Sequence, residues 1–177
     1  MLINQELAKA INEQIGREFH AKLRYVNTAA YFDTEDLPQL ATFFYNQSQD
    51  EDLHAMKFVH YLVDAGARIQ IPAIDQPMDI VNSAMEAAQL ALDWEIENTH
   101  QINTLMDLAV KSNDHITQDF LRWFETEQLE EVSTMEALVR TIRRAGDNLL
   151  LVEQFLVSNP LGNGKMQVET SPQTQAA

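Results

Sequence analysis

Apolar side chains recur at steps of three and four positions over most of this chain, the spacing that gathers side chains on one face of an α-helix. Glycine and proline, which interrupt helices, are scarce: the 177 residues include five of each. The interruptions divide the chain into four long predicted helices and a short fifth one, over residues 5–32, 37–65, 82–111, 115–145 and 147–158. We therefore expect an all-α fold.

Local signals mark where the predicted helices begin. Asp36 lies just before Leu37 and Pro38, so we expect Asp36 to cap the second helix and Pro38 to occupy its first turn. Asn82 or Ser83 is placed to cap the third helix. These signals indicate the same helix boundaries as the apolar periodicity.

The segment over residues 67–81 decides the topology. It contains Pro72 and Pro77 and shows no helical periodicity. About fifteen extended residues span roughly 50 Å, and a helix of about 30 residues is roughly 45 Å long. The segment can therefore run the length of a bundle, so that helices 2 and 3 lie parallel while short turns make the other neighbours antiparallel. We predict a four-helix bundle with one long crossover between helices 2 and 3.

The chain changes character near its C-terminal end. After Pro160 it becomes polar and loses its periodicity. We expect residues 1–158 to form one domain and residues 159–177 to form a flexible polar tail. A domain of this size can bury about two-thirds of its unfolded surface without disulfides.

Composition and charge exclude several functional classes. The chain has no cysteine, which excludes disulfides, thiolate metal clusters and thiol catalysis. A formal net charge of -15 argues against nucleic acid and anionic membranes as partners, because both are negatively charged. The sequence shows no secretory leader and no apolar run of about 18 residues, so we expect a cytoplasmic protein with no membrane partner. Cations are the natural ligands of such a chain.

Each long predicted helix carries a glutamate near its midpoint, within its apolar stripe. These are Glu18, Glu51, Glu95 and Glu131, and His54 lies one helical turn after Glu51. An ionised carboxylate inside a core costs several kcal/mol unless it is neutralised, so four converging carboxylates need cations. Carboxylate oxygens with one imidazole nitrogen suit iron or manganese better than calcium. The pattern predicts a dinuclear metal site, in which Glu51 is best placed to bridge the two ions.

Each of these residues has a simpler explanation when it is taken alone. A single glutamate at such a position is more often a solvated residue at the edge of the stripe, and a single histidine is more often an ordinary core or boundary residue. The co-occurrence of four glutamates at matching depth with a Glu-x-x-His on one helix favours the metal site.

The same residues resemble a known family, the non-haem bacterial-type ferritins. The resemblance covers about residues 1–158 and rests on five segments: Asn12-Glu13-Gln14 with Glu18 and Tyr25, Glu51-x-x-His54, Glu95, Trp123, and Glu127-Gln128-x-Glu130-Glu131. It implies a ferritin-like bundle with ferroxidase activity, in which Fe²⁺ is oxidised by O₂ or H₂O₂ at a dinuclear iron centre. It also implies iron storage as ferric mineral inside a homo-oligomeric cage of 24 subunits.

The resemblance assigns roles to the inward-facing residues. Glu18, Glu51 and His54 match the ligands of a first iron position. Glu95 and Glu131, together with Glu51, match the ligands of a second position, so that Glu51 bridges the pair.

A third iron site is implied beside this centre. Asp50, Glu127 and Glu130 fall where prokaryotic ferritins build that site, and Asp50 stands where a glutamate is common. Gln128 matches a glutamine that orients a bound water or dioxygen.

Two aromatic residues and one absent ligand complete the comparison with the family. Tyr25 and Trp123 match aromatic residues that lie near the centre and donate electrons, although Tyr25 alone is more often a core tyrosine bonded to a carboxylate. Haem-containing bacterioferritins carry a haem-ligating methionine just after the bridging glutamate, where this chain has Asp52. We therefore expect no haem.

Two other readings remain open from the sequence. A dimetal carboxylate oxidase or peroxidase of the rubrerythrin type would usually need a second Glu-x-x-His, and rubrerythrins add a cysteine-rich iron domain, which a chain without cysteine cannot form. A non-catalytic helical bundle used for assembly would hold the buried acids as structural polar contacts.

Overall fold

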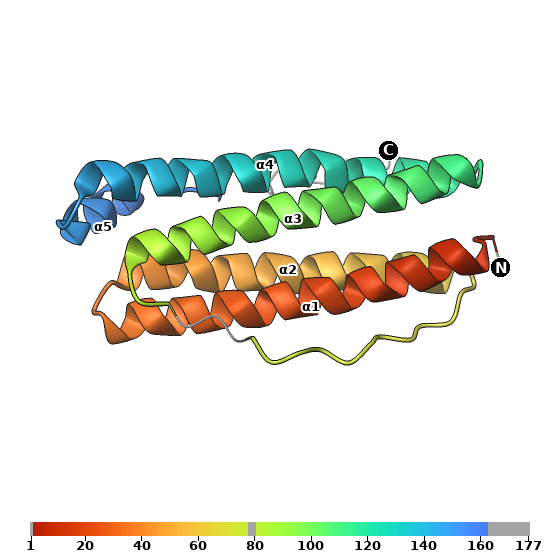
Figure 1. Cartoon of the computed structure of the whole chain (residues 1–177), viewed down its shortest axis with the longest axis horizontal. Coiled ribbons are helices and arrows are strands. Elements are labelled where there is room, and N and C mark those ends of the chain that lie inside the picture. The colour runs from red at the N-terminus through yellow and green to blue at the C-terminus, as the bar shows by residue number, and fades with distance from the viewer. Residues whose placement is uncertain (1, 78–80, 163–177) are drawn as a thin grey trace, which may run out of the picture.

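The computed structural model describes residues 2–77 and 81–162. It is an all-α bundle in which the long helices lie side by side along one axis (Figure 1). The helices are α1 (Gln5–Thr34), α2 (Pro38–Asp64), α3 (Ala84–Lys111), α4 (His115–Ala145) and α5 (Leu149–Ser158). The fold class and the five predicted helices are confirmed. Most of the predicted tail, residues 163–177, lies outside the described residues.

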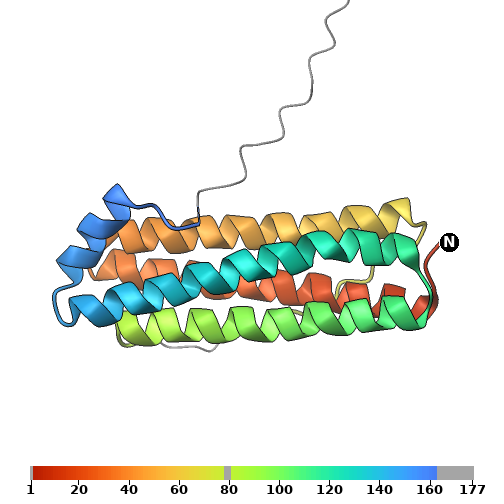
Figure 2. The same ribbon diagram turned by 90° about the horizontal axis from the view of Figure 1, so that it is seen from above.

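The predicted topology is also confirmed. Residues 67–77, which follow α2, run back along the outside of the bundle beside α1, and α2 and α3 point in the same direction (Figure 1). Short turns join α1 to α2 and α3 to α4, and each of these pairs packs antiparallel. The short α5 lies at the end where α2 begins and α4 ends (Figure 2).

The crossover segment is fastened to α1 by two residues one turn apart. The side chain of Asn12 donates from Nδ2 to the carbonyl of Arg68 at 3.1 Å and accepts from the backbone N–H of Gln70 at 2.6 Å. At Gly16, an added Cβ would lie only 2.5 Å from Cγ of Pro72. Glycine therefore lets the proline ring rest directly on the helix backbone.

The expected cap of α2 is wrong. Asp36 has a positive φ of 56°, and Leu37, which precedes the helix, makes no side-chain capping bond. The carboxylate of Glu153 in α5 caps the helix instead, accepting from the backbone N–H groups of Gln39 at 2.8 Å and Leu40 at 2.9 Å. Pro38 does lie in the first turn, as expected.

The structure shows which of the two candidates, Asn82 or Ser83, caps α3. Ser83 accepts a hydrogen bond from the backbone N–H of Glu86 at 3.1 Å, so Ser83 is the capping residue. The neighbouring Asn82 donates its backbone N–H to the Glu86 carboxylate at 2.9 Å. This start to α3 fixes how the long crossover re-enters the bundle.

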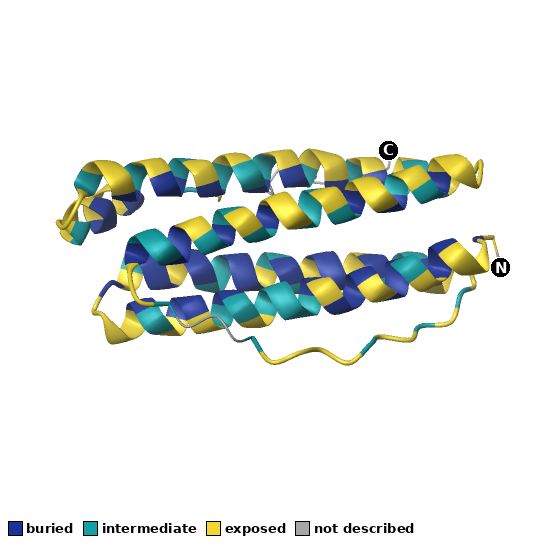
Figure 3. Ribbon diagram, viewed as in Figure 1, coloured by how far each residue is buried: buried dark blue, intermediate teal, exposed yellow. Residues whose placement is uncertain are grey.

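The apolar core has two parts. Buried side chains face the bundle interior along all four long helices, and exposed side chains cover the outer faces (Figure 3). One apolar cluster, which includes Phe32, Phe44 and Leu138, lies toward α5. The other, which includes Leu7, Phe58 and Phe124, lies toward the opposite end. Along their helices, six buried polar residues fall between these clusters: Glu18, Glu51, His54, Glu95, Gln128 and Glu131. Within the described ranges, no helix is long and apolar enough to cross a membrane.

Candidate metal centre

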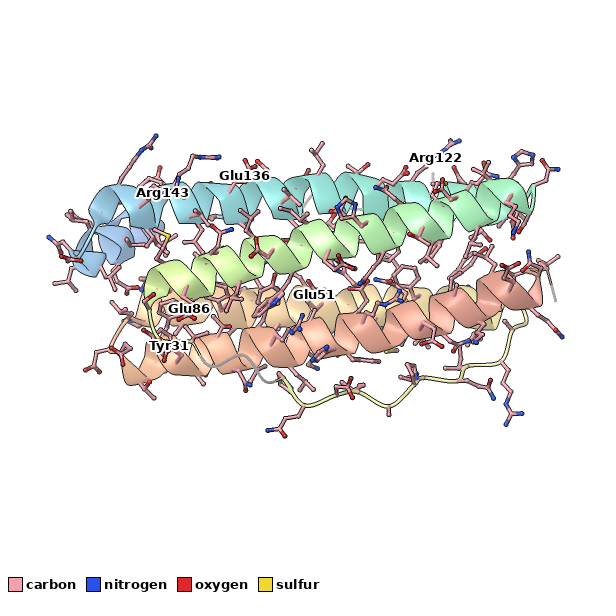
Figure 4. All side chains as sticks on the ribbon, viewed as in Figure 1. Tyr31, Glu51, Glu86, Arg122, Glu136 and Arg143 are labelled. Carbon is pink, nitrogen blue, oxygen red and sulfur yellow. The ribbon has the colours of Figure 1, made fainter. Side chains whose placement is uncertain are left out.

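The inward-facing polar residues meet near the middle of the bundle, where Glu51 lies (Figure 4). The residues predicted for the dinuclear site and its glutamine and tyrosine neighbours are all buried: Glu18, Tyr25, Glu51, His54, Glu95, Gln128 and Glu131. They come from all four long helices. The helical periodicity explains this, because each lies on the same stripe as the apolar core residues one turn before and after it. Lys22, which falls in the α1 stripe, instead turns outward and pairs with Asp52 at 2.7 Å.

Three of these residues form a compact group on α1 and α2. One oxygen each of Glu18 and Glu51 and one ring nitrogen of His54 lie within 4.8 Å of one another. Nδ1 of His54 is 3.5 Å from Oε2 of Glu51. Among the residues that the structure describes, neither ring nitrogen of His54 has a hydrogen-bond partner, and neither does Oε2 of Glu51, although all three atoms are buried. Buried polar atoms without partners are rare and costly, and a metal ion would satisfy them.

Glu95 from α3 lies across the bundle from this group. The hydroxyl of Tyr25 donates to Oε1 of Glu95. The side-chain amide of Gln128 donates from Nε2 to Oε2 of Glu95 at 3.2 Å and to its backbone carbonyl at 3.2 Å. Glu51 also lies within hydrogen-bonding reach of Glu18 and Glu95. Glu51 is therefore the carboxylate between the two sides, as expected of a bridging ligand.

A second compact group joins His54 to two residues of α4. Ligand atoms of His54, Glu127 and Glu131 lie within 4.8 Å of one another. Glu127, which the resemblance assigns to a third site with Asp50 and Glu130, therefore lies directly beside the centre. Asp50 is only half-buried and accepts from Nε2 of Gln47 at 3.4 Å.

The buried carboxyl groups of the centre have raised pKa values. Burial raises the pKa of Glu51 and of Glu131 well above the usual value, and the neighbouring charge of Glu95 raises both further. Burial also raises the pKa of Glu95, to about 7, although hydrogen bonds from Tyr25 and Gln128 act in the opposite direction. These raised pKa values mean that the three carboxyl groups keep their protons to higher pH than usual, and a cation that enters the centre competes with those protons.

The two aromatic residues of interest have different surroundings. Tyr25 is fully buried, and burial together with Glu95 raises the pKa of its hydroxyl well above the usual value, which keeps it a hydrogen-bond donor. Trp123 is half-buried, with its ring edge-on to His54 at 5.6 Å between centroids. The ammonium of Lys57 lies 3.7 Å over the Trp123 ring. Both aromatic residues therefore lie next to ligands of the centre.

Three buried or half-buried amides surround the centre, and the sequence pattern predicted no role for them. Gln14 donates to Oε1 of Glu18 at 2.6 Å, and Asn98 donates to Oε2 of Glu18 at 3.4 Å. Gln47 approaches Glu131. The signal that could have identified them is helical spacing, since Gln14 lies four residues before Glu18, and Asn98 lies three residues after Glu95.

The donor set limits the chemistry of the centre. Anionic carboxylates with one imidazole are hard ligands that fit a first-row transition metal such as iron and stabilise its higher oxidation state. The two groups of ligand atoms share His54, and Glu51 lies between Glu18 and Glu95.

Comparison with known proteins agrees with this site. The family model for the ferritin-like domain matches residues 8–145. Ferritin BfrB of Mycolicibacterium smegmatis is 43% identical over 146 residues, which cover 82% of this chain and 81% of the relative. The bacterial non-heme ferritin of Staphylococcus saprophyticus is 35% identical over 160 residues, which cover 89% of this chain and 96% of the relative.

The fold is similar to solved structures as well. An open pore ferritin from the hyperthermophilic archaeon Archaeoglobus fulgidus superposes with a TM-score of 0.85 at 28% sequence identity, over 88% of this chain and 96% of that chain. The family match spans most of the bundle, including all the residues that converge at its centre. This chain therefore belongs to the ferritin family and carries a ferroxidase-type site of carboxylates and histidine.

Proposed function

We propose that this chain is an iron-storage subunit that oxidises Fe²⁺ at two adjacent positions in its bundle. Glu18, Glu51 and His54 hold the first ion, and Glu95 and Glu131 hold the second, with Glu51 shared between them. The observation that carries the proposal is that buried ligand atoms of His54 and Glu51 have no partner within residues 2–77 and 81–162, while one ligand atom of each lies within 4.8 Å of an oxygen of Glu18. A purely structural network would pair these atoms with each other or with donors.

The carboxyl groups of the centre promote the reaction by exchanging protons for Fe²⁺ and by placing negative charge around the ions. Fe²⁺ binding displaces the protons shared among Glu51, Glu95 and Glu131, which leaves anionic oxygens around both ions. Such oxygens favour Fe³⁺, so each Fe²⁺ gives up one electron, and O₂ takes two electrons and two protons to become H₂O₂. H₂O₂ as the oxidant takes two electrons and two protons to become water. The Fe³⁺ product then hydrolyses and leaves as mineral.

Neighbouring residues support this reaction. Gln128 keeps Glu95 oriented and presents an amide next to the second position, where it can orient a water or oxygen molecule. Tyr25 is hydrogen-bonded to Glu95, which places an oxidisable ring in contact with a ligand of the second position. Trp123 lies edge-on to His54, which places a second oxidisable ring beside a ligand of the first position.

A third iron position beside the centre is part of the proposal. Asp50, Glu127 and Glu130 line the side of the centre near α2 and α4, and the pKa values of Asp50 and Glu127 are raised by partial burial. Because Glu127 also reaches His54 and Glu131, it can pass an ion between the third position and the dinuclear centre.

Further features of the proposal concern the whole chain. We infer that 24 copies form a closed cage that stores the mineral, and that the protein works in the cytoplasm. We infer no haem, because Asp52, at the position of a haem-ligating methionine, forms an ion pair with Lys22.

The test is an anaerobic Fe²⁺ titration of the metal-free protein, followed by rapid mixing with oxygen while absorbance is recorded. The proposal expects saturation at two or three ions per chain and a fast oxidation phase proportional to that number. No stoichiometric binding, with oxidation no faster than in buffer, would leave the non-catalytic bundle as the better reading. Stoichiometric binding with oxygen consumed by an organic substrate instead would favour an oxidase or peroxidase of another type.

A further inference from the structure

A row of hydrogen-bonded amides crosses from the surface of α1 to the far side of the metal centre. Arg17, which is exposed, donates to Oε1 of Gln14 at 3.1 Å. Gln14 donates from Nε2 to Oδ1 of Asn98 at 2.7 Å, and Asn98 donates from Nδ2 to Oε1 of Gln128 at 3.3 Å. Gln128 ends the row at Glu95. The row links α1, α3 and α4 through side chains alone.

Donor and acceptor chemistry fixes the direction of this row. A guanidinium can only donate, so Gln14 must meet Arg17 with its carbonyl oxygen and turn its amide nitrogen inward. Asn98 must then present oxygen to Gln14 and nitrogen to Gln128, and Gln128 must present nitrogen to Glu95. Each amide therefore points an N–H group toward the centre, and such donors stabilise the ionised form of a carboxylate there.

Asn98 is the junction of the row. Its Nδ2 donates both to Gln128 at 3.3 Å and to Oε2 of Glu18 at 3.4 Å. Glu18 belongs to the first metal position, and Gln128 holds Glu95 of the second. Gln14 also donates to Glu18, at 2.6 Å, but it reaches Gln128 only through Asn98. Asn98 is therefore the residue of this row that contacts both Glu18 and Gln128 directly.

We propose that Asn98 is a positioning residue that couples the two metal positions, by fixing the orientation of Glu18 directly and that of Glu95 through Gln128. The inference rests on the proposed two-ion site. Groups that orient metal ligands commonly change metal affinity by about 10- to 100-fold when they are removed. Because Asn98 acts on both sides, its loss weakens both positions.

The experiment uses the full-length, metal-stripped protein and Co²⁺ as the probe, with visible absorption bands reporting each position. Glu18→Ala assigns the bands of the first position, because it removes a ligand of that position. Asn98→Leu keeps the size of the side chain and removes its hydrogen bonds. We expect Asn98→Leu to weaken Co²⁺ binding at both positions by about tenfold.

Gln101→Leu is the matched control. It makes the same kind of change on the same helix, at a partly exposed amide that bonds only to Glu97 among the described residues. We expect Gln101→Leu to leave both Co²⁺ affinities unchanged. Unchanged affinities and spectra in Asn98→Leu would overturn the role of Asn98, while a wild-type protein that binds no Co²⁺ would instead overturn the two-ion site itself.

A double-mutant cycle tests the path through Gln128. Gln128→Leu should weaken the second position. In that background, adding Asn98→Leu should still weaken the first position but change the second position little further, because its route to Glu95 is already lost. Fully additive losses at the second position would contradict the path.

Thermal unfolding of the metal-free variants separates positioning from stability. We expect Asn98→Leu and Gln101→Leu to unfold within a few degrees of each other while their Co²⁺ spectra differ. Asn98→Ala serves in place of Asn98→Leu if the leucine variant does not fold. A loss of stability in both Asn98 variants with wild-type Co²⁺ spectra would reduce Asn98 to a structural residue.

Discussion

At the scale of single residues, Glu51 is the carboxylate whose contacts reach both sides of the centre. Its carboxyl group lies within hydrogen-bonding reach of Glu18 and Glu95, and one of its oxygens faces His54 without a bond. The free energy needed to bury these groups together is recovered only when cations enter. The residue that connects both sides should therefore be the most sensitive to substitution.

Glu51→Ala should abolish the fast phase of Fe²⁺ oxidation, because it removes the oxygen ligands shared by both positions. We expect at least a 100-fold lower rate, an order of magnitude in line with the loss of a group that acts on both reacting ions. Stopped-flow absorbance after mixing with oxygen measures the rate. Glu97→Ala, at an exposed glutamate of α3, is the control and should retain the wild-type rate. A wild-type rate in Glu51→Ala would contradict the site assignment.

The raised pKa of Glu95 makes a prediction about pH. A carboxyl whose pKa is higher in the folded state binds its proton more tightly there, so its contribution to stability is complete below the unfolded value of 4.5 and is lost as the pH rises through about 7. The free energy of unfolding of the metal-free protein should therefore fall over this range. Saturating Co²⁺ should remove the fall, because the metal takes the place of the proton.

Urea unfolding at a series of pH values measures this effect. Glu95→Gln is the comparison, since an uncharged amide cannot titrate and the fall between about pH 4.5 and pH 7 should be smaller in that variant. Equal slopes in wild type and Glu95→Gln would show that repulsion among the other acidic residues, and not Glu95, causes the pH dependence.

At the scale of elements, the crossover depends on the contact between Gly16 and Pro72. Gly16→Ala should destabilise the protein by about 1–2 kcal/mol, because the new methyl group meets the proline ring at 2.5 Å and moves the crossover off α1. In a Pro72→Ala background the same change should become stabilising by about 0.5–1 kcal/mol, because alanine is the better helix residue. Urea unfolding of the four variants measures both values, and the same sign in both backgrounds would contradict the contact.

The α5 helix is joined to α2 by the capping carboxylate of Glu153. Glu153→Gln should destabilise the protein by about 1–2 kcal/mol, because it removes one acceptor and the negative charge that the helix N-terminus favours. It should also speed amide hydrogen exchange in the first turn of α2, at Gln39 and Leu40. Glu125→Gln, at an exposed glutamate of α4, should change neither quantity. Unchanged exchange at the first turn in Glu153→Gln would rule out the cap.

At the scale of the whole molecule, each end of the bundle carries large apolar side chains that the single chain leaves exposed. Leu150, Leu151 and Val157 are exposed on α5, and Leu2 and Ile116 are exposed at the opposite end. Water contact with these groups is unfavourable, so they are natural contacts between copies of the chain. Both ends of an elongated bundle would then be used in assembly.

We predict that the protein in solution has a mass of about 24 times that of the 20.2 kDa chain. Light scattering after size-exclusion chromatography measures this mass. Leu151→Glu should lower it, since a charge at an apolar contact opposes association while leaving the helix itself intact. A wild-type protein that runs as a single chain at micromolar concentration would rule out the cage.

The sequence alone determined the helices, their order and the depth at which the acidic residues lie. Helical periodicity is a local property, so spacing along the chain placed Glu18, Glu51, Glu95 and Glu131 on inward faces before any contact was known. The topology followed from the length of the crossover, because an extended segment of that length can span the whole bundle. The sequence also paired Glu51 with His54, because both lie on one helix one turn apart.

Only the tertiary structure decided which distant residues complete these elements. The cap of α2 comes from Glu153, more than a hundred residues away along the chain, in place of the adjacent Asp36. Asn98 of α3 donates to Glu18 of α1, and Glu127 of α4 lies close to His54 of α2. These contacts depend on the rotation and relative height of packed helices, which the local repeat of each helix does not specify.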